Sequence, residues 1–155
     1  MLIPAARLLV VTVWCGSLWT IGYLVAPTLF ATLTDRALAG TIAGSLFRIE
    51  AWLSVVAAVT LFALERAAPA AQRLGRRHLL LAGGMLACTL VGYFVLHPFM
   101  AELRAAAGPG GVMASELRAR FGMLHGISSG FYLLQSLLGV ALVIGLRPRE
   151  TAERT

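Results

Sequence analysis

The sequence contains no lysine and few charged residues of any kind, and these shortages exclude an ordinary soluble domain. Only 13% of the 155 residues are charged, whereas soluble proteins carry about 25%. All 13 basic residues are Arg, and hydrophobic residues make up 59% of the chain. The formal net charge of +6 does not indicate nucleic-acid binding, because no basic residues cluster with aromatic residues outside the hydrophobic runs. This composition is typical of a membrane protein.

Motifs for common chemistries are also missing. The sequence has no C-x-x-C-H, no H-E-x-x-H and no Met-rich run, which are signatures of haem attachment or metal binding. Cys15 and Cys88 lie inside apolar runs, where a reduced thiol usually serves as a packing residue. Ser128 and Ser129 have no acidic residue close in sequence, and a membrane-helix Ser usually bonds to its own backbone. We therefore predict that the protein is not an enzyme.

Four apolar runs are present, and each is long enough to cross a bilayer. A helix needs about 20 residues to span the hydrocarbon core. The runs cover residues 8–33, 46–64, 79–98 and 121–146. They predict an all-α fold, in which a single domain over residues 1–155 forms four transmembrane helices in an antiparallel bundle.

Charge asymmetry between the loops predicts how the bundle is oriented. With four spans, both termini and the middle loop lie on one side, which carries eight Arg and three Glu. The opposite side carries five Arg and four acidic residues. Arg-rich loops remain in the cytoplasm. We therefore predict a multi-pass protein in the lipid bilayer of the cell inner membrane, with both termini cytoplasmic.

Two local features are expected to shape the spans. Pro27 lies near the end of the first run and predicts a kink, because proline removes a backbone donor from the helix. Residues 34–45 are predicted to form a linker, in which Gly40 and Gly44 mark a short helical turn.

Two strips of small residues predict close packing between helices. Small side chains four residues apart let a neighbouring backbone approach, and such a surface also suits a homo-oligomer. The strips are Gly84, Cys88 and Gly92 in the third run and Gly122, Gly126 and Gly130 in the fourth.

Polar side chains near the outer side predict a candidate functional cluster. His125, Ser128, Tyr132 and Gln135 recur at helical spacing along the fourth run, and polar groups avoid facing lipid. The third and fourth spans are consecutive and antiparallel, so His97 should lie at a depth similar to that of His125. The predicted cluster consists of His97, His125, Tyr93, Ser128, Glu50 and Tyr132.

The role of this cluster has two interpretations. A buried His in a membrane bundle usually belongs to a structural or proton-handling network. Two histidines at similar depth can instead ligate haem or copper, with His97 and His125 as the ligands. Glu50 is either an interfacial residue beside Arg48 or an inward-facing partner of a buried histidine.

Four segments spread over the chain, taken in order, carry a family resemblance. They are Trp14-x-Gly16, Ala26-Pro27-x-Leu29-Phe30, Ala39-Gly40-x-x-Ala43-Gly44-x-Leu46-Phe47 and Phe121-x-x-x-His125-Gly126-x-Ser128. Together they resemble the domain of unknown function 4149 family, also described as transmembrane protein 205-like. The resemblance implies a small four-span membrane protein. Eukaryotic relatives are associated with resistance to platinum drugs, which suggests transport, trafficking or metal handling.

One segment departs from the family pattern. Many relatives have a proline and aromatic residues after the Leu-Phe pair, whereas this chain has Arg48-Ile49-Glu50, so no role for that turn is carried over. The leading prediction is a structural, accessory or small-ligand and metal-handling role for the outer polar cluster. The alternatives are a haem or copper redox protein and a subunit of an oligomeric transporter.

Overall fold

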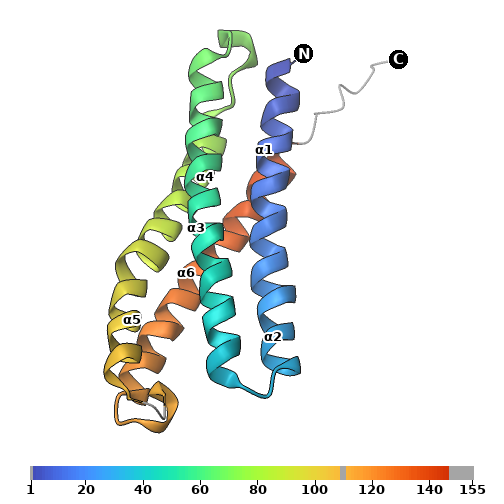
Figure 1. The fold of residues 1–155 in the computed structure, drawn as a ribbon. Coiled ribbons are helices and arrows are strands. Elements are labelled where there is room, and N and C mark those ends of the chain that lie inside the picture. Colours follow the sequence, from blue (N-terminus) through green and yellow to red (C-terminus); the bar gives the residue numbers. More distant parts are fainter. Residues whose placement is uncertain (1, 109–110, 147–155) are drawn as a thin grey trace.

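Four long helices account for nearly all of the computed structural model, which describes residues 2–108 and 111–146. Each helix is long and apolar enough to cross a membrane, and neighbours in sequence run antiparallel (Figure 1). No strand occurs within those residues. The predicted all-α bundle of four membrane-spanning helices is therefore confirmed. Met1, Pro109, Gly110 and residues 147–155 of the predicted single domain lie outside the described residues.

The first and third spans each contain a π-helical segment just before a proline. Pro27 and Pro98 have no backbone N–H to donate, so the helical ladder loses a bond there and adjusts by widening. The first span is α1 (Leu2–Trp19), the π segment Thr20–Val25 and α2 (Ala26–Thr32), and the third is α4 (Arg76–Thr89), the π segment Leu90–Val95 and α5 (Leu96–Ala106). The feature predicted as a kink at Pro27 is thus a change of helix type.

The second span, α3 (Arg36–Ala67), begins earlier than predicted. The Asp35 side chain accepts hydrogen bonds from the backbone nitrogens of Ala37 and Leu38, at 2.8 and 3.0 Å. An aspartate in this position satisfies backbone donors that a helix start would otherwise leave free. The helical turn predicted at Gly40 and Gly44 is therefore part of the second span itself, and only residues 34 and 35 of the predicted linker precede the helix.

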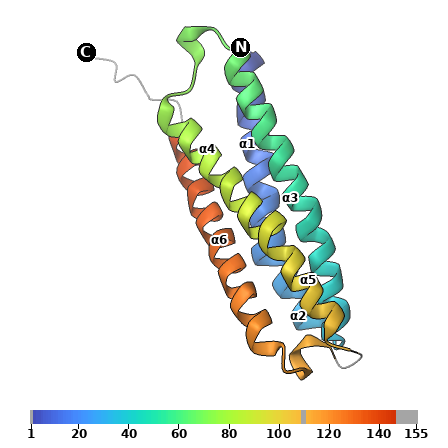
Figure 2. The ribbon, with the colours of Figure 1, turned by 90° about the vertical axis from the view of Figure 1, so that its left-hand side faces the viewer.

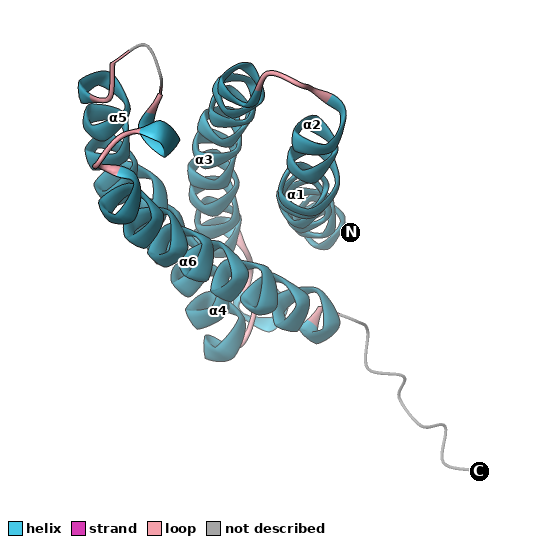
Figure 3. Cartoon of the chain, turned by 90° about the horizontal axis from the view of Figure 1, so that it is seen from below, coloured by secondary structure: helices cyan, strands magenta, loops and turns pink. Residues whose placement is uncertain are grey.

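The four spans are arranged so that α1 and α4 each pack against both α3 and α6 (Arg118–Gly145). Figure 2 shows α4 and α6 running side by side along the bundle. In the end-on view of Figure 3, α2 and α5 lie on opposite sides of α3. The π segments therefore lie on different sides of the bundle interior.

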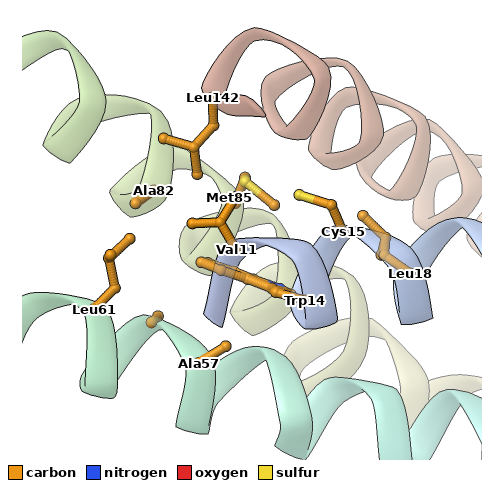
Figure 4. Packing of buried hydrophobic residues seen from close by; sticks show 10 residues of the cluster. Val11, Trp14, Cys15, Leu18, Ala57, Leu61, Ala82, Met85 and Leu142 are labelled. Carbon is orange, nitrogen blue, oxygen red and sulfur yellow. The ribbon is translucent and has the colours of Figure 1, made fainter. Parts of the chain in front are cut away.

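The apolar core lies in the half of the bundle that contains the start of α1. Figure 4 shows its side chains converging from all four spans. The cluster consists of Val11, Trp14, Cys15, Leu18, Ala57, Ala58, Leu61, Ala82, Met85 and Leu142. Trp14 is fully buried at 0% exposure. The small side chains of Ala57 and Ala58 let α3 approach this large ring.

The two predicted small-residue strips have opposite surroundings. A Cβ added at Gly84 would lie 3.1 Å from Leu138 Cδ1, and one at Gly92 would lie 3.4 Å from Phe131 Cβ, both on α6. Cys88, between them in the strip, is buried. The third span therefore packs closely against α6, as that strip predicts.

The strip on the fourth span does not make the close contact predicted for it. Gly122, Gly126 and Gly130 are exposed, and a Cβ added at any of them would meet no atom of the described residues within 4 Å. They therefore pack against no other span of this chain. Glycines of α6 that approach a neighbour closely are Gly139, where an added Cβ would lie 3.2 Å from Cys15 Sγ and 3.3 Å from Met85 Cε, and Gly145, where it would lie 2.8 Å from His78 Nε2.

Substitution of a buried and of an exposed glycine is expected to distinguish the two faces of α6. Gly139→Leu should lower the free energy of unfolding by about 1–3 kcal/mol, because it overfills the contact with α1 and α4. Gly126→Leu, the matched control, should cause no loss, since Leu favours a helix more than Gly does. Titration with dodecyl sulfate in mild detergent measures both. A large loss for Gly126→Leu would contradict the exposed placement and would indicate contact with a second copy.

Candidate functional site

The most unusual group in the interior is the carboxyl group of Glu50, near the middle of α3. The residue is 3% exposed. Its Oε1 accepts a hydrogen bond from Ser54 Oγ at 3.3 Å, while its buried Oε2 has no hydrogen-bond partner among the described residues. Within the same residues, the only ion pair joins Arg7 and Glu65 and does not involve Glu50. An ionised carboxylate buried without a counter-charge costs several kcal/mol. The site therefore suits a neutral acid or a carboxylate with a bound cation.

Ser54 connects this carboxyl group to two other spans. Its hydroxyl accepts from Trp14 Nε1 at 2.8 Å and from Gln135 Nε2 at 3.3 Å, and donates to Glu50. A hydroxyl has one donor and two acceptor positions, so the capacity of Ser54 is fully used. Residues from α1, α3 and α6 thus meet in one buried network, which we call the Glu50 network: Glu50, Ser54, Trp14 and Gln135.

The local sequence explains why these groups meet. Glu50 and Ser54 are four residues apart, so they lie on the same face of α3. Ala51, on that part of the helix, is buried and small, which brings α3 close to its neighbours. The network lies beside the apolar core, since Trp14 belongs to both.

Two tyrosines lie next to the Glu50 network. Tyr132 Oη donates to the backbone oxygen of Leu18 at 2.5 Å, just before the π segment of the first span. Tyr23 Oη donates to Ser136 Oγ at 2.9 Å, and its ring meets that of Tyr132 edge-on at 6.1 Å. Tyr23 is 51% exposed, so this bond joins the surface of the bundle to the residue after Gln135.

The six residues of the predicted cluster differ in burial and in their contacts. Glu50 and Tyr132 lie in and beside the Glu50 network. His97 is half-buried and stacks on Tyr93, with ring centroids 4.7 Å apart. His125 is exposed and stacks on Phe121. A single outer cluster of these six side chains therefore stays a prediction that no contact among the described residues supports.

Ser128, the remaining member, has a different role. Its hydroxyl donates to the backbone oxygen of Gly92 at 3.2 Å, within the π segment of the third span. It therefore links α6 to the π-helical backbone of the third span, in which each hydrogen bond spans five residues instead of four.

The geometry of α6 explains why His125 differs from the rest of its predicted face. At 3.6 residues per turn, residues 125 and 135 lie about 80° apart around the helix axis. Gln135 is buried at one edge of this face, and His125 is exposed at the other. A polar face of that width cannot all point into the bundle.

Glu50 faces inward, but its contacts differ from the prediction. Its hydrogen-bond partner is Ser54 rather than a histidine. The described residues contain no group of three or more His, Cys, Asp or Glu side chains placed to hold a metal ion. Ligation of haem or copper by His97 and His125 therefore stays a prediction that no contact in the structure supports.

Sequence reasoning missed Trp14, Ser54 and Tyr23 as site residues. For Ser54 a signal was available, because a hydroxyl one turn after an acidic residue in a membrane span satisfies that residue locally. For Trp14 and Tyr23 there was none, because an aromatic residue in a span usually packs or anchors at the interface.

Comparison with known proteins places the chain in a family. Neither a curated protein nor a solved structure matches it significantly. A family model, described as domain of unknown function DUF4149, matches residues 9–109. The match includes Trp14, Glu50 and Ser54, whereas Gln135 lies beyond it. The chain, an all-α protein with four membrane-spanning helices and a buried carboxyl group between them, therefore belongs to the DUF4149 family.

Proposed function

We propose that this protein is a non-enzymatic, small-ligand-handling membrane protein in which Glu50 exchanges a proton for a small cation. The observation that carries the proposal is the Glu50 carboxyl group, which has one oxygen bonded to Ser54 and the other buried without a partner among the described residues. Ionisable residues inside membrane spans are costly and usually mark ion or proton sites.

The neighbouring groups support reversible loading of this site. Ser54 is fixed by Trp14 and Gln135, so one oxygen of the carboxyl group remains oriented, while the other has no partner among the described residues. Tyr23 is an exposed residue beside this network, and its hydroxyl donates to Ser136, the residue after Gln135.

Infrared difference spectroscopy tests the proposal directly. A neutral carboxyl group has a C=O stretch that an ionised one lacks. The purified protein in lipid vesicles should show such a band, and the band should disappear in Glu50→Gln. Raising the pH, or adding sodium or methylammonium chloride at constant pH and ionic strength, should weaken the wild-type band, because each leaves Glu50 ionised.

Matched controls define the outcome. Glu102→Gln removes an exposed carboxyl group on α5 and should leave the band unchanged. A Glu50 band that responds to neither pH nor cations in folded protein would refute the proposal and make Glu50 a structural acid. A band that responds to pH alone would refute the cation part.

We also propose that the protein lies in the cell inner membrane with both termini in the cytoplasm. The support is the excess of Arg that the sequence carries in its two terminal segments and middle loop. The start of α1, the connection from α3 to α4 and the end of α6 lie toward the same end of the bundle (Figures 1 and 2). A periplasm-active reporter should be silent when fused after Thr155 and active when inserted at Gly110. The reverse pattern would contradict the orientation.

A further inference from the structure

A groove lies beside α1 at the Arg-rich end of the bundle, far from Glu50 along the helices. Its volume is about 480 Å³, and its walls are mainly apolar side chains, including Leu8 from α1, Leu74 from the middle loop and Val143 from α6. Arg7 is the one charged residue among the described residues that line it. An apolar groove on a membrane span that ends at a cationic group matches the shape of an anionic amphiphile.

Arg7 is built into this position rather than lying on the surface. The residue is 4% exposed, it forms an ion pair with Glu65, and its Nη1 donates to the backbone oxygen of Gln72 at 2.6 Å. Glu65 is held in turn, because its Oε2 accepts from the backbone nitrogen of Leu74 at 2.8 Å. The guanidinium group is therefore fixed in orientation by the second span and the middle loop.

One nitrogen of this guanidinium group, the buried Nη2, has no hydrogen-bond partner among the described residues. A buried N–H group without an acceptor is costly, and a guanidinium group suits phosphate oxygens especially well. The arrangement therefore points to an anionic acceptor that approaches from the groove.

The surroundings add positive charge. Arg7 and Glu65 neutralise each other, but exposed arginines follow in the same region of the chain, namely Arg66, Arg73, Arg76 and Arg77. A second, smaller groove of about 230 Å³ is lined by Arg66 and Arg73 and shares Leu74 with the first. Basic pockets beside transmembrane helices bind anionic lipid headgroups.

We propose that this end of the bundle binds one anionic phospholipid. The acyl chain lies along the groove against Leu8, Leu74 and Val143, and a phosphate oxygen accepts a hydrogen bond from Arg7 Nη2. The exposed arginines of the middle loop attract the headgroup. The lipid thereby completes the hydrogen bonding of Arg7 and joins α1 to α6 at the end where α1 begins.

Lipid binding by the full chain in mild detergent tests this proposal. Native mass spectrometry should show one retained phosphatidylglycerol, with affinity about tenfold or more above that of phosphatidylcholine with the same acyl chains. Inorganic phosphate at equal concentration should neither bind with comparable affinity nor raise the melting temperature, because it lacks the acyl chain. Equal binding of the two lipids would overturn the proposal, as would equal stabilisation by phosphate.

Three variants locate the site. Leu8→Trp places a bulky ring at the groove, whereas Leu9→Trp, the matched control, changes the next residue of α1, which is also exposed and does not line the groove. Leu8→Trp should weaken phosphatidylglycerol binding about tenfold and Leu9→Trp should not. Arg7→Lys should keep the protein folded, as judged by its helical circular dichroism, and reduce the preference for phosphatidylglycerol. If all three variants bind as the wild type does, the lipid lies elsewhere and the proposal is wrong.

Discussion

Replacing Arg7 by Ala is expected to lower the free energy of unfolding by about 3–5 kcal/mol, because Glu65 would remain buried without its counter-charge. Both side chains are almost fully buried, with exposures of 5% and 7%. Arg7→Ala also removes the donor to the Gln72 backbone oxygen. Denaturation with dodecyl sulfate in mild detergent measures the loss.

The double substitution Arg7→Ala with Glu65→Ala measures the coupling between the two side chains. It should cost less than the sum of the two single substitutions, because removing both partners leaves no buried charge unpaired. Arg66→Ala is the control, since this neighbouring Arg is exposed and should change stability by about 0.5 kcal/mol or less. Additive losses would show that Arg7 and Glu65 are not coupled.

Replacing Trp14 by Ala is expected to have an effect of similar size, about 3–5 kcal/mol. The indole ring is fully buried where α1 meets the other spans, and its N–H donates to Ser54. The substitution therefore opens a large cavity and removes a support of the Glu50 network.

Trp14→Phe separates the contribution of the buried ring from the contribution of its hydrogen bond to Ser54. It keeps most of the ring but removes the donor, and should cost about 0.5–1.5 kcal/mol for the hydrogen bond, plus a smaller packing loss. In the infrared experiment it should also shift the Glu50 band, because Ser54 is no longer held from that side. Trp52→Ala, at a position 57% exposed, is the control and should cost much less than Trp14→Ala. Comparable losses at Trp14 and Trp52 would contradict the assignment of Trp14 to the core.

The Arg-rich end of the bundle and the middle of its second span have different polar chemistry, and this bears on both proposals. Arg7 and Glu65 neutralise each other at the end where α1 begins, whereas Glu50 lies near the middle of its span with hydroxyl and amide neighbours. A protein that needed only stability at these positions would gain more from well-packed apolar side chains than from buried charges. We therefore interpret the Glu50 network and the Arg7 groove as binding features.

The sequence by itself determined the number of spans, the fold class and the family. Lipid offers no partners for backbone polar groups, so four apolar runs of spanning length must form helices. The start of α3 at Asp35 was also readable in principle, because the capping interaction is local. These features depend on residues close together in the chain.

The rotation of each helix about its axis was decided only by the tertiary structure. The fourth span has glycines on one side and a broad polar face on another, and periodicity alone does not say which of them is buried. Packing against α1 and α4 selected Gly139 and Gln135 for the interior and left Gly126 and His125 exposed. The same choice stacked His97 on Tyr93 and His125 on Phe121. It also placed Glu50 in the network with Ser54, Trp14 and Gln135, because contacts between distant spans depend on how all four helices fill their shared core.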